Sequence, residues 1–290
     1  MQNKYCLIEK MPDGIENSVW KVLNIEDEKF YILKKRCRQR IEADPNGPKR
    51  QYNILSDMRK NMIPVVPPCK QNVFFIGQED VLYPFIDGQP KLLENEKMIT
   101  QLVNSIKTYT SYNIKKKDMI TKYDADFAYQ QINDMNKSIM KEKHSLLVAE
   151  GLEYLKVSFP KEENLGEGIV HGDLQLGNIL WNEEEIIALV DWDNCMMGPK
   201  ELDVAHMYVD VLLLSGDKIA ESFLNTCRTE LVLSSKKINY FINYELFYAL
   251  LNHYKWTQGF FGRNVKLKSK EIDSLLINMI QSRKRRCGYG

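Results

Sequence analysis

Two polar side chains near the ends of one short hairpin-like stretch could hold a metal ion together. The stretch lies between His171 and Asp191 and reads HGDLQLGNILWNEEEIIALVD, with apolar runs at 179–181 and 186–190 on either side of a polar turn. This pattern predicts a β-hairpin, whose two ends return to the same side. Asn178, before the first strand, should therefore lie beside Asp191, after the second. An amide oxygen and a carboxylate suit Mg²⁺, a hard cation that prefers oxygen ligands.

Asp173 stands five residues before Asn178, in the spacing H-x-D-x-x-x-x-N. A carboxylate at this point can orient a substrate hydroxyl and accept its proton. The spacing, followed by a strand pair and an aspartate, is that of the kinase catalytic loop. It therefore indicates phosphoryl transfer with Asp173 as the catalytic residue. A histidine in an HGD tripeptide is more often packed than catalytic, so we assign His171 a structural role in holding the loop.

These residues resemble the aminoglycoside phosphotransferase family, which includes choline-kinase-like relatives. The resemblance extends from about Gly14 to the predicted helix near Met207, and the chain beyond matches only in general character. Gly172 stands where most protein kinases carry an arginine. The motifs that carry the resemblance are HGDxxxxN at 171–178, VDWD at 190–193, Gly198-Pro199 and LDVA at 202–205.

The resemblance implies an α+β, protein-kinase-like fold with two lobes. A small N-lobe with an antiparallel sheet would comprise residues 1–86 and end at the connection between the lobes. A larger, mainly helical C-lobe, residues 87–290, would carry the catalytic loop, the metal site and the acceptor pocket. The local patterns agree with this division, because polar turns separate apolar runs up to residue 33 and helical spacing dominates 96–112 and 127–157.

The resemblance also assigns nucleotide-binding residues. The segment 14–22, GIENSVWKV, is similar to the loop that binds the ATP phosphates, with Ser18 as its small hydroxyl. It has one glycine, so an ordinary hairpin turn is the alternative. Lys34, at the end of an apolar strand, matches the lysine that contacts the α- and β-phosphates. Adenine would accept a hydrogen bond from the Ile86 N–H and donate one to the Pro84 carbonyl.

One position departs from the family pattern. The family usually carries a glutamate that pairs with the phosphate-binding lysine, and Gln51 stands there. Glutamine can hydrogen-bond a lysine but cannot neutralise it, so we expect the ion pair to be absent or supplied by another acid such as Glu42. Asp193 could assist a metal, bind substrate or be structural. Asp203 resembles the aspartate that braces the catalytic loop, with a helix cap as the alternative.

The composition limits the classes of partner. A chain of 290 residues with 44% hydrophobic residues can bury one large core or two smaller ones. A net charge of +1 gives no global field to attract nucleic acid or a membrane surface, and we expect neither as a partner. The acidic residues gather between 160 and 217, around the motif, where a metal and a cationic substrate could be held.

The cysteine spacing and the hydropathy favour a cytoplasmic protein. Six cysteines lack C-x-x-C spacing and are expected to be reduced thiols. The first ten residues contain no apolar run typical of a secretion signal, and no stretch is long enough for a membrane span.

We therefore predict an ATP- and Mg²⁺-dependent phosphotransferase that acts on a hydroxyl of a small molecule. An aminoglycoside-type antibiotic is the first candidate acceptor, and choline, homoserine or a sugar is the alternative. Gln51 also leaves open a catalytically weak, kinase-shaped binding or structural protein. Relatives place substrate contacts in the stretch that contains Tyr244, Glu245, Asn252, His253 and Trp256.

Overall fold

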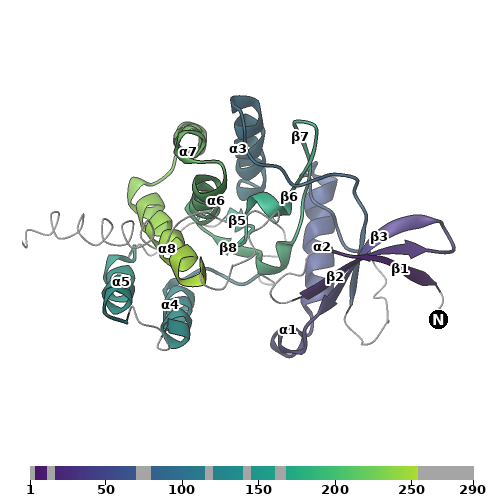
Figure 1. The fold of residues 1–290 in the computed structure, drawn as a ribbon, viewed down its shortest axis with the longest axis horizontal. Coiled ribbons are helices and arrows are strands. Elements are labelled where there is room, and N and C mark those ends of the chain that lie inside the picture. Colours follow the sequence, from purple (N-terminus) through teal and green to yellow (C-terminus); the bar gives the residue numbers. More distant parts are fainter. Residues whose placement is uncertain are drawn as a thin grey trace, which may run out of the picture. The chain divides into compact units, whose positions relative to one another are not determined.

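The computed structural model describes residues 4–11, 17–69, 80–114, 120–139, 145–160 and 168–253 (Figure 1). They belong to two compact units. The first unit draws on Met1–Gln89, Ile114–Met119 and Ile179–Asp193, and the second on Pro90–Asn113, Ile120–Asn178 and Asn194–Gly290. The hairpin that follows Asn178 thus lies in the first unit, and the loop that precedes it lies in the second.

A four-stranded antiparallel sheet, in the order β1-β2-β3-β4, is the core of the first unit. Val22, Leu33 and Leu82 form its buried cluster, which agrees with the predicted apolar strands. Successive side chains of a strand point to opposite faces, and Lys34 follows Leu33 with only 6% of its surface exposed. The strands are β1 (Tyr5–Lys10), β2 (Asn17–Asn24), β3 (Lys29–Arg36) and β4 (Val81–Pro84).

Two helices follow the third strand, α1 (Arg38–Ala43) and α2 (Gly47–Lys60). Pro48 lies in the first turn of α2, where its missing N–H leaves no hydrogen bond unmade. Ile54, Leu55 and Met58 are buried along one side of α2. The Pro- and Gly-rich break at 44–48 and the apolar spacing after it predict a helix at 49–61, and α2 confirms this prediction.

The predicted hairpin is also confirmed. It consists of β6 (Ile179–Asn182) and β7 (Glu185–Leu189), and Ile179 pairs with Leu189 at its open end. Two bridges outside the hairpin fix it in the first unit, because Leu189 pairs with Val65 and Trp181 pairs with Gln89.

Helices make up most of the second unit. Among its described residues, the short strands β5 (Gly168–Val170) and β8 (Met196–Gly198) pair antiparallel. The side chain of Asn95 caps α3 by accepting the N–H of Met98 at 3.0 Å. The apolar periodicity predicted at 127–157 corresponds to α4 and α5. The helices are α3 (Glu96–Thr110), α4 (Ala125–Ile139), α5 (Ser145–Ser158), α6 (Lys200–Leu214), α7 (Asp217–Leu231) and α8 (Ser235–His253).

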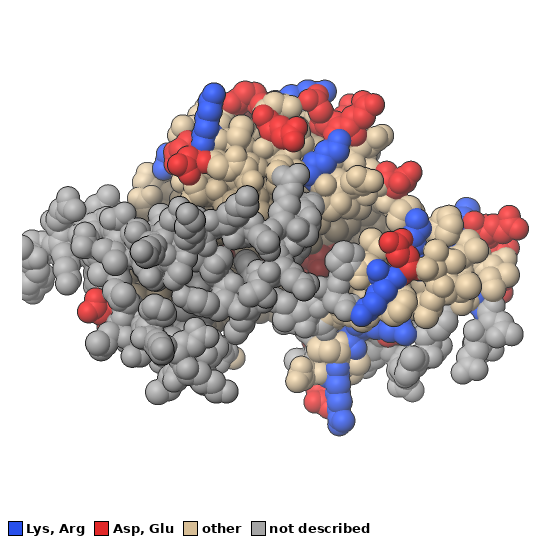
Figure 2. Space-filling model, in the orientation of Figure 1, with Lys and Arg blue, Asp and Glu red and all other residues tan. Residues whose placement is uncertain are grey.

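The surface of the second unit over α3 and α7 carries charges of both signs. Figure 2 shows acidic and basic side chains interspersed there, without a patch of one sign. Lys107 and Glu230 form an ion pair at 3.0 Å between these two helices. Among the helices that the structure describes, none is both long enough and apolar enough to cross a membrane. Trp256, in the stretch predicted to contact substrate, and Gly14 of the predicted phosphate loop lie outside the described residues.

Candidate active site

Two aspartates of α6 hold the loop from His171 to Leu176. Asp203 is fully buried and accepts hydrogen bonds from the backbone N–H groups of His171, at 2.6 Å, and Gly172, at 2.9 Å. The hydroxyl of Tyr109 donates a third bond to Asp203 at 2.8 Å. About two turns further along α6, Asp210 accepts a hydrogen bond from the N–H of Leu176 at 2.7 Å. These contacts favour the predicted brace for Asp203 over a helix cap.

The backbone of this loop requires a glycine at its second residue. Gly172 has a φ of +77°, in the left-handed region that side chains rarely adopt. A Cβ built on it would overlap the carbonyl oxygen of Asn194. Gly172 therefore replaces the arginine of protein kinases for a local steric reason.

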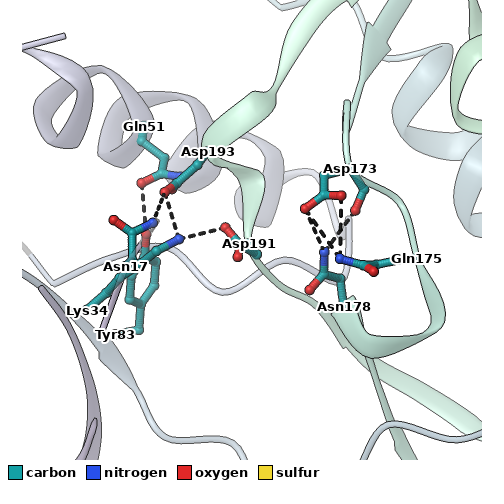
Figure 3. Close-up of polar contacts among 9 residues, drawn as sticks. All are labelled: Asn17, Lys34, Gln51, Tyr83, Asp173, Gln175, Asn178, Asp191 and Asp193. Carbon is teal, nitrogen blue, oxygen red and sulfur yellow. Dashed lines mark hydrogen bonds and ion pairs between the residues drawn. The ribbon is translucent and has the colours of Figure 1, made fainter. Parts of the chain in front are cut away.

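Asp173 emerges from the braced loop with 29% of its side chain exposed. The amide nitrogen of Asn178 donates to the Asp173 carbonyl at 2.8 Å and to its carboxylate at 3.4 Å (Figure 3). Gln175 donates to the same carboxylate at 3.4 Å. Because the amide nitrogen of Asn178 is engaged in this way, its oxygen is the atom available as a metal ligand.

His206 of α6 lies against the same carboxylate, a contact that sequence reasoning missed. Its Nε2 is 3.7 Å from Asp173, and its Nδ1 is 3.1 Å from the buried carboxylate of Glu245 in α8. Burial disfavours the charged imidazolium, but Glu245, Asp173 and Asp210 outweigh it and raise the pKa of His206 to about 10. The signal in the sequence was its spacing, since His206 follows Asp203 by three residues and so shares its helix face.

In the first unit, two carboxylates enclose the predicted nucleotide-binding lysine. Lys34 Nζ lies 2.6 Å from Asp191 and 2.7 Å from Asp193 (Figure 3). Burial alone would lower the pKa of Lys34, but the two carboxylates raise it above its ordinary value of 10.5. Lys34 is therefore a charged ammonium held by the segment that follows β7.

Gln51 reaches this cluster through Asp193. Its amide nitrogen donates to Asp193 at 2.8 Å, and its oxygen accepts the hydroxyl of Tyr83 at 2.8 Å. Asn17 donates to Asp193 at 3.4 Å. The ion pair with Lys34, expected to be absent or supplied by another acid such as Glu42, is supplied by other acids. Glu42 instead forms an exposed ion pair with Arg38, one helical turn away in α1.

The remaining predicted nucleotide-binding residues also lie in the first unit. Ser18, in β2, accepts a hydrogen bond from Trp20 Nε1 at 2.9 Å. Pro84 ends β4 and is exposed, and Ile86 follows it as a half-buried residue. The structure therefore places Ser18 and Lys34 on neighbouring strands, while Pro84 lies on the strand beyond.

Asp191 has the oxygen chemistry predicted for a cation ligand. It follows β7 with a φ of +63° and keeps 41% of its side chain exposed, with one carboxylate oxygen on Lys34. Within the described residues, no group of three or more His, Cys, Asp or Glu side chains could hold a metal ion. The predicted donor set is smaller, one amide oxygen and one carboxylate, and both fit Mg²⁺ by type.

Comparison with known protein families shows the class of the protein. The family model described as "Phosphotransferase enzyme family" matches residues 8–225. The chain belongs to this family, and the prediction of a phosphotransferase enzyme is confirmed.

Several solved structures of phosphotransferases have a similar fold. A macrolide 2'-phosphotransferase type I is 16% identical, with a TM-score of 0.61 over 87% of each chain. A thermostable mutant of aminoglycoside phosphotransferase APH(4)-Ia, in a ternary complex with AMP-PNP and hygromycin B, is 15% identical, with a TM-score of 0.66 over 94% of this chain and 93% of that one. The streptomycin-ATP-APH(2")-IIa ternary complex is 12% identical, with a TM-score of 0.62 over 93% and 94%. These matches confirm the protein-kinase-like α+β fold.

Proposed function

We propose that this phosphotransferase moves the γ-phosphate of ATP to a hydroxyl of a small molecule, with Asp173 as the catalytic residue. The observation that carries the proposal is that Asp173 lies on a fixed loop and still has an accessible carboxylate. Its loop is fixed by backbone hydrogen bonds to α6, while its carboxylate remains 29% exposed. A carboxylate held in this way can orient an acceptor hydroxyl and take its proton as the phosphorus–oxygen bond forms.

The nucleotide would be bound by residues of the first unit. Lys34 is the charged group that would contact the phosphates, and Ser18 would supply a hydroxyl. Adenine would lie against the Pro84 carbonyl and the Ile86 N–H. The two similar proteins whose structures contain AMP-PNP or ATP support ATP as the phosphate donor.

Asn178 and Asp191 would hold Mg²⁺. The pairing of Ile179, which follows Asn178, with Leu189, two residues before Asp191, supports this choice of ligands. When bound, the ion would neutralise charge on the phosphate oxygens of the nucleotide. Asn178 would present its oxygen because its nitrogen is engaged by Asp173.

We assign residues 1–86 to nucleotide binding and residues 87–290 to catalysis and acceptor recognition. An aminoglycoside-type antibiotic is the first candidate acceptor, because relatives of similar fold bind hygromycin B and streptomycin. Among the described residues, three carboxylates (Asp173, Asp210 and Glu245) lie around the cation His206, and this acidic surrounding supports a cationic acceptor. Choline, homoserine or a sugar is the second candidate, and we propose a cytoplasmic location.

A screen for ADP release tests the proposal. Purified protein with ATP and Mg²⁺ is offered aminoglycosides, a macrolide, choline, homoserine and simple sugars, and phosphorylated product is identified by mass. We expect ADP release to rise with at least one hydroxylated amine. ATP binding without ADP release or product for any acceptor would favour the catalytically weak, kinase-shaped protein instead.

A further inference from the structure

His206 is the one cation described among three carboxylates that come from three different parts of the second unit. Glu245 belongs to α8, Asp210 to α6, and Asp173 to the loop after β5. His206 is largely buried, with 20% of its side chain exposed, and Glu245 is more buried, at 8%. A buried ionised carboxylate needs a partner, and the imidazolium supplies one to Glu245.

The contact with Glu245 fixes which ring atom faces Asp173. Glu245 takes the Nδ1 side at 3.1 Å, a hydrogen-bonding distance, so the Nε2 side is directed at the Asp173 carboxylate, 3.7 Å away. At 3.7 Å the second contact is an ion pair without a direct hydrogen bond. What His206 offers to Asp173 is therefore positive charge at a fixed point.

We propose that His206 is a positioning residue for Asp173, and that Glu245 acts on Asp173 only through His206. This inference rests on the proposed function, in which Asp173 takes the proton of the acceptor. The cation holds the carboxylate directed toward α6, at a fixed place from which it can accept the proton. Glu245 keeps the ring oriented and charged.

The proposal differs from a packing role in a way that can be measured. If His206 only filled space, a neutral side chain of similar length would replace it. If its charge is what matters, His206→Gln should fail and His206→Lys should retain part of the function. Unit charges about 4 Å apart interact appreciably when they are shielded from water. The raised pKa of His206 agrees with a cation at neutral pH.

The test compares single-turnover hydrolysis of ATP, with water as the acceptor, among full-length variants. We expect His206→Gln to lower the rate constant on the order of tenfold, within the range seen when a residue that orients a functional ligand is removed. The Kd for ATP should change less than about twofold, a small free-energy difference. Glu245→Gln should lower the rate similarly, and adding it to His206→Gln should have no further effect, as for residues that act in series. Tyr208→Phe, on the same helix but bonded to Glu221 of α7, is the matched control and should leave the rate unchanged.

The outcomes separate the inference from the proposed function. A wild-type rate in His206→Gln, with a large loss in Asp173→Asn, would overturn the role of His206 and leave the proposed function intact. A wild-type rate in Asp173→Asn would overturn the proposed function itself. Should a variant fail to fold, the NMR signals of the His206 ring in the wild-type protein decide. We expect a protonated ring at pH 8, and a neutral ring would contradict the proposal.

Discussion

Gln51 donates a hydrogen bond to Asp193 across 2.8 Å, although 142 residues separate them in the chain. Asp193 in turn pairs with Lys34 at 2.7 Å. The lysine is therefore neutralised from the segment after β7, and α2 contributes a neutral hydrogen bond instead of a charge. A glutamine suits this position, because a glutamate there would place a second carboxylate directly against Asp193 and the two charges would repel.

This relationship predicts the effect of restoring the family's usual residue. Gln51→Glu should destabilise the protein by about 1–3 kcal/mol, because it replaces a hydrogen bond to a carboxylate with repulsion between like charges. Urea unfolding measures the change. The double variant Gln51→Glu/Asp193→Asn should recover most of the loss, since one acid again faces an amide. An increase in stability of Gln51→Glu alone would contradict the role given to Asp193.

Removing the lysine should leave two carboxylates close together. Lys34→Met is expected to lower the free energy of unfolding by about 1–3 kcal/mol, less than for a fully buried pair, since Asp191 is 41% exposed. The same variant should lose most of its affinity for ATP, measured by calorimetry. Lys29→Met, at the exposed start of the same strand, is the control and should change neither quantity.

The brace under the catalytic loop gives a third prediction. Asp203 accepts three hydrogen bonds in a fully buried position. In Asp203→Asn, the new NH₂ group would face at least one of the groups that now donate to the carboxylate, so we expect a loss of about 2–4 kcal/mol in the free energy of unfolding. Thermal unfolding and turnover should fall together. Asp217→Asn, an exposed residue in the first turn of α7, should leave both nearly unchanged.

The steric requirement at Gly172 is tested by adding one methyl group. Gly172→Ala should lower the free energy of unfolding by about 1–3 kcal/mol because of the left-handed backbone. The overlap of the new Cβ with the Asn194 carbonyl should add to this loss. Unchanged unfolding in urea would show that the loop can adopt another conformation.

The protonation of His206 predicts a dependence of stability on pH. Its pKa is raised from 6.5 to about 10 in the folded protein, so its stabilising charge is fully present below pH 6.5 and is lost as the pH rises through about 10. Between these values the wild type should lose about 1.4 kcal/mol per pH unit relative to His206→Gln. Chemical unfolding of both proteins at pH 7, 8 and 9 measures this difference. Parallel curves for the two proteins would contradict it.

The resemblance to the family predicted the fold class, and local patterns in the sequence predicted several of its elements. The hairpin at 179–189 and the helix α2 follow from apolar spacing and from turn residues, which act over a few positions. Lys34 was predicted from its match to the family's lysine, and the structure buries it. The hairpin and α2 were accessible because each depends on neighbours in the chain.

Contacts between distant segments could not be read in the same way. No spacing rule connects Gln51 with Asp193, so the sequence offered Glu42, which instead pairs with Arg38 one turn away. His206 shares a helix face with Asp203, but no spacing rule connects it with Glu245 of α8. Its role becomes visible only when α8 brings Glu245 beside it.

The central claim is that Asp173 takes the proton of the acceptor hydroxyl, and replacing it with alanine tests this most directly. Phosphate transfer from ATP to an acceptor identified by the ADP-release screen should be nearly abolished in Asp173→Ala, since general-base catalysis contributes roughly 10²- to 10⁴-fold. The affinity for ATP, measured by calorimetry in the presence of Mg²⁺, should remain close to that of the wild type. Wild-type turnover in the alanine variant would contradict the account.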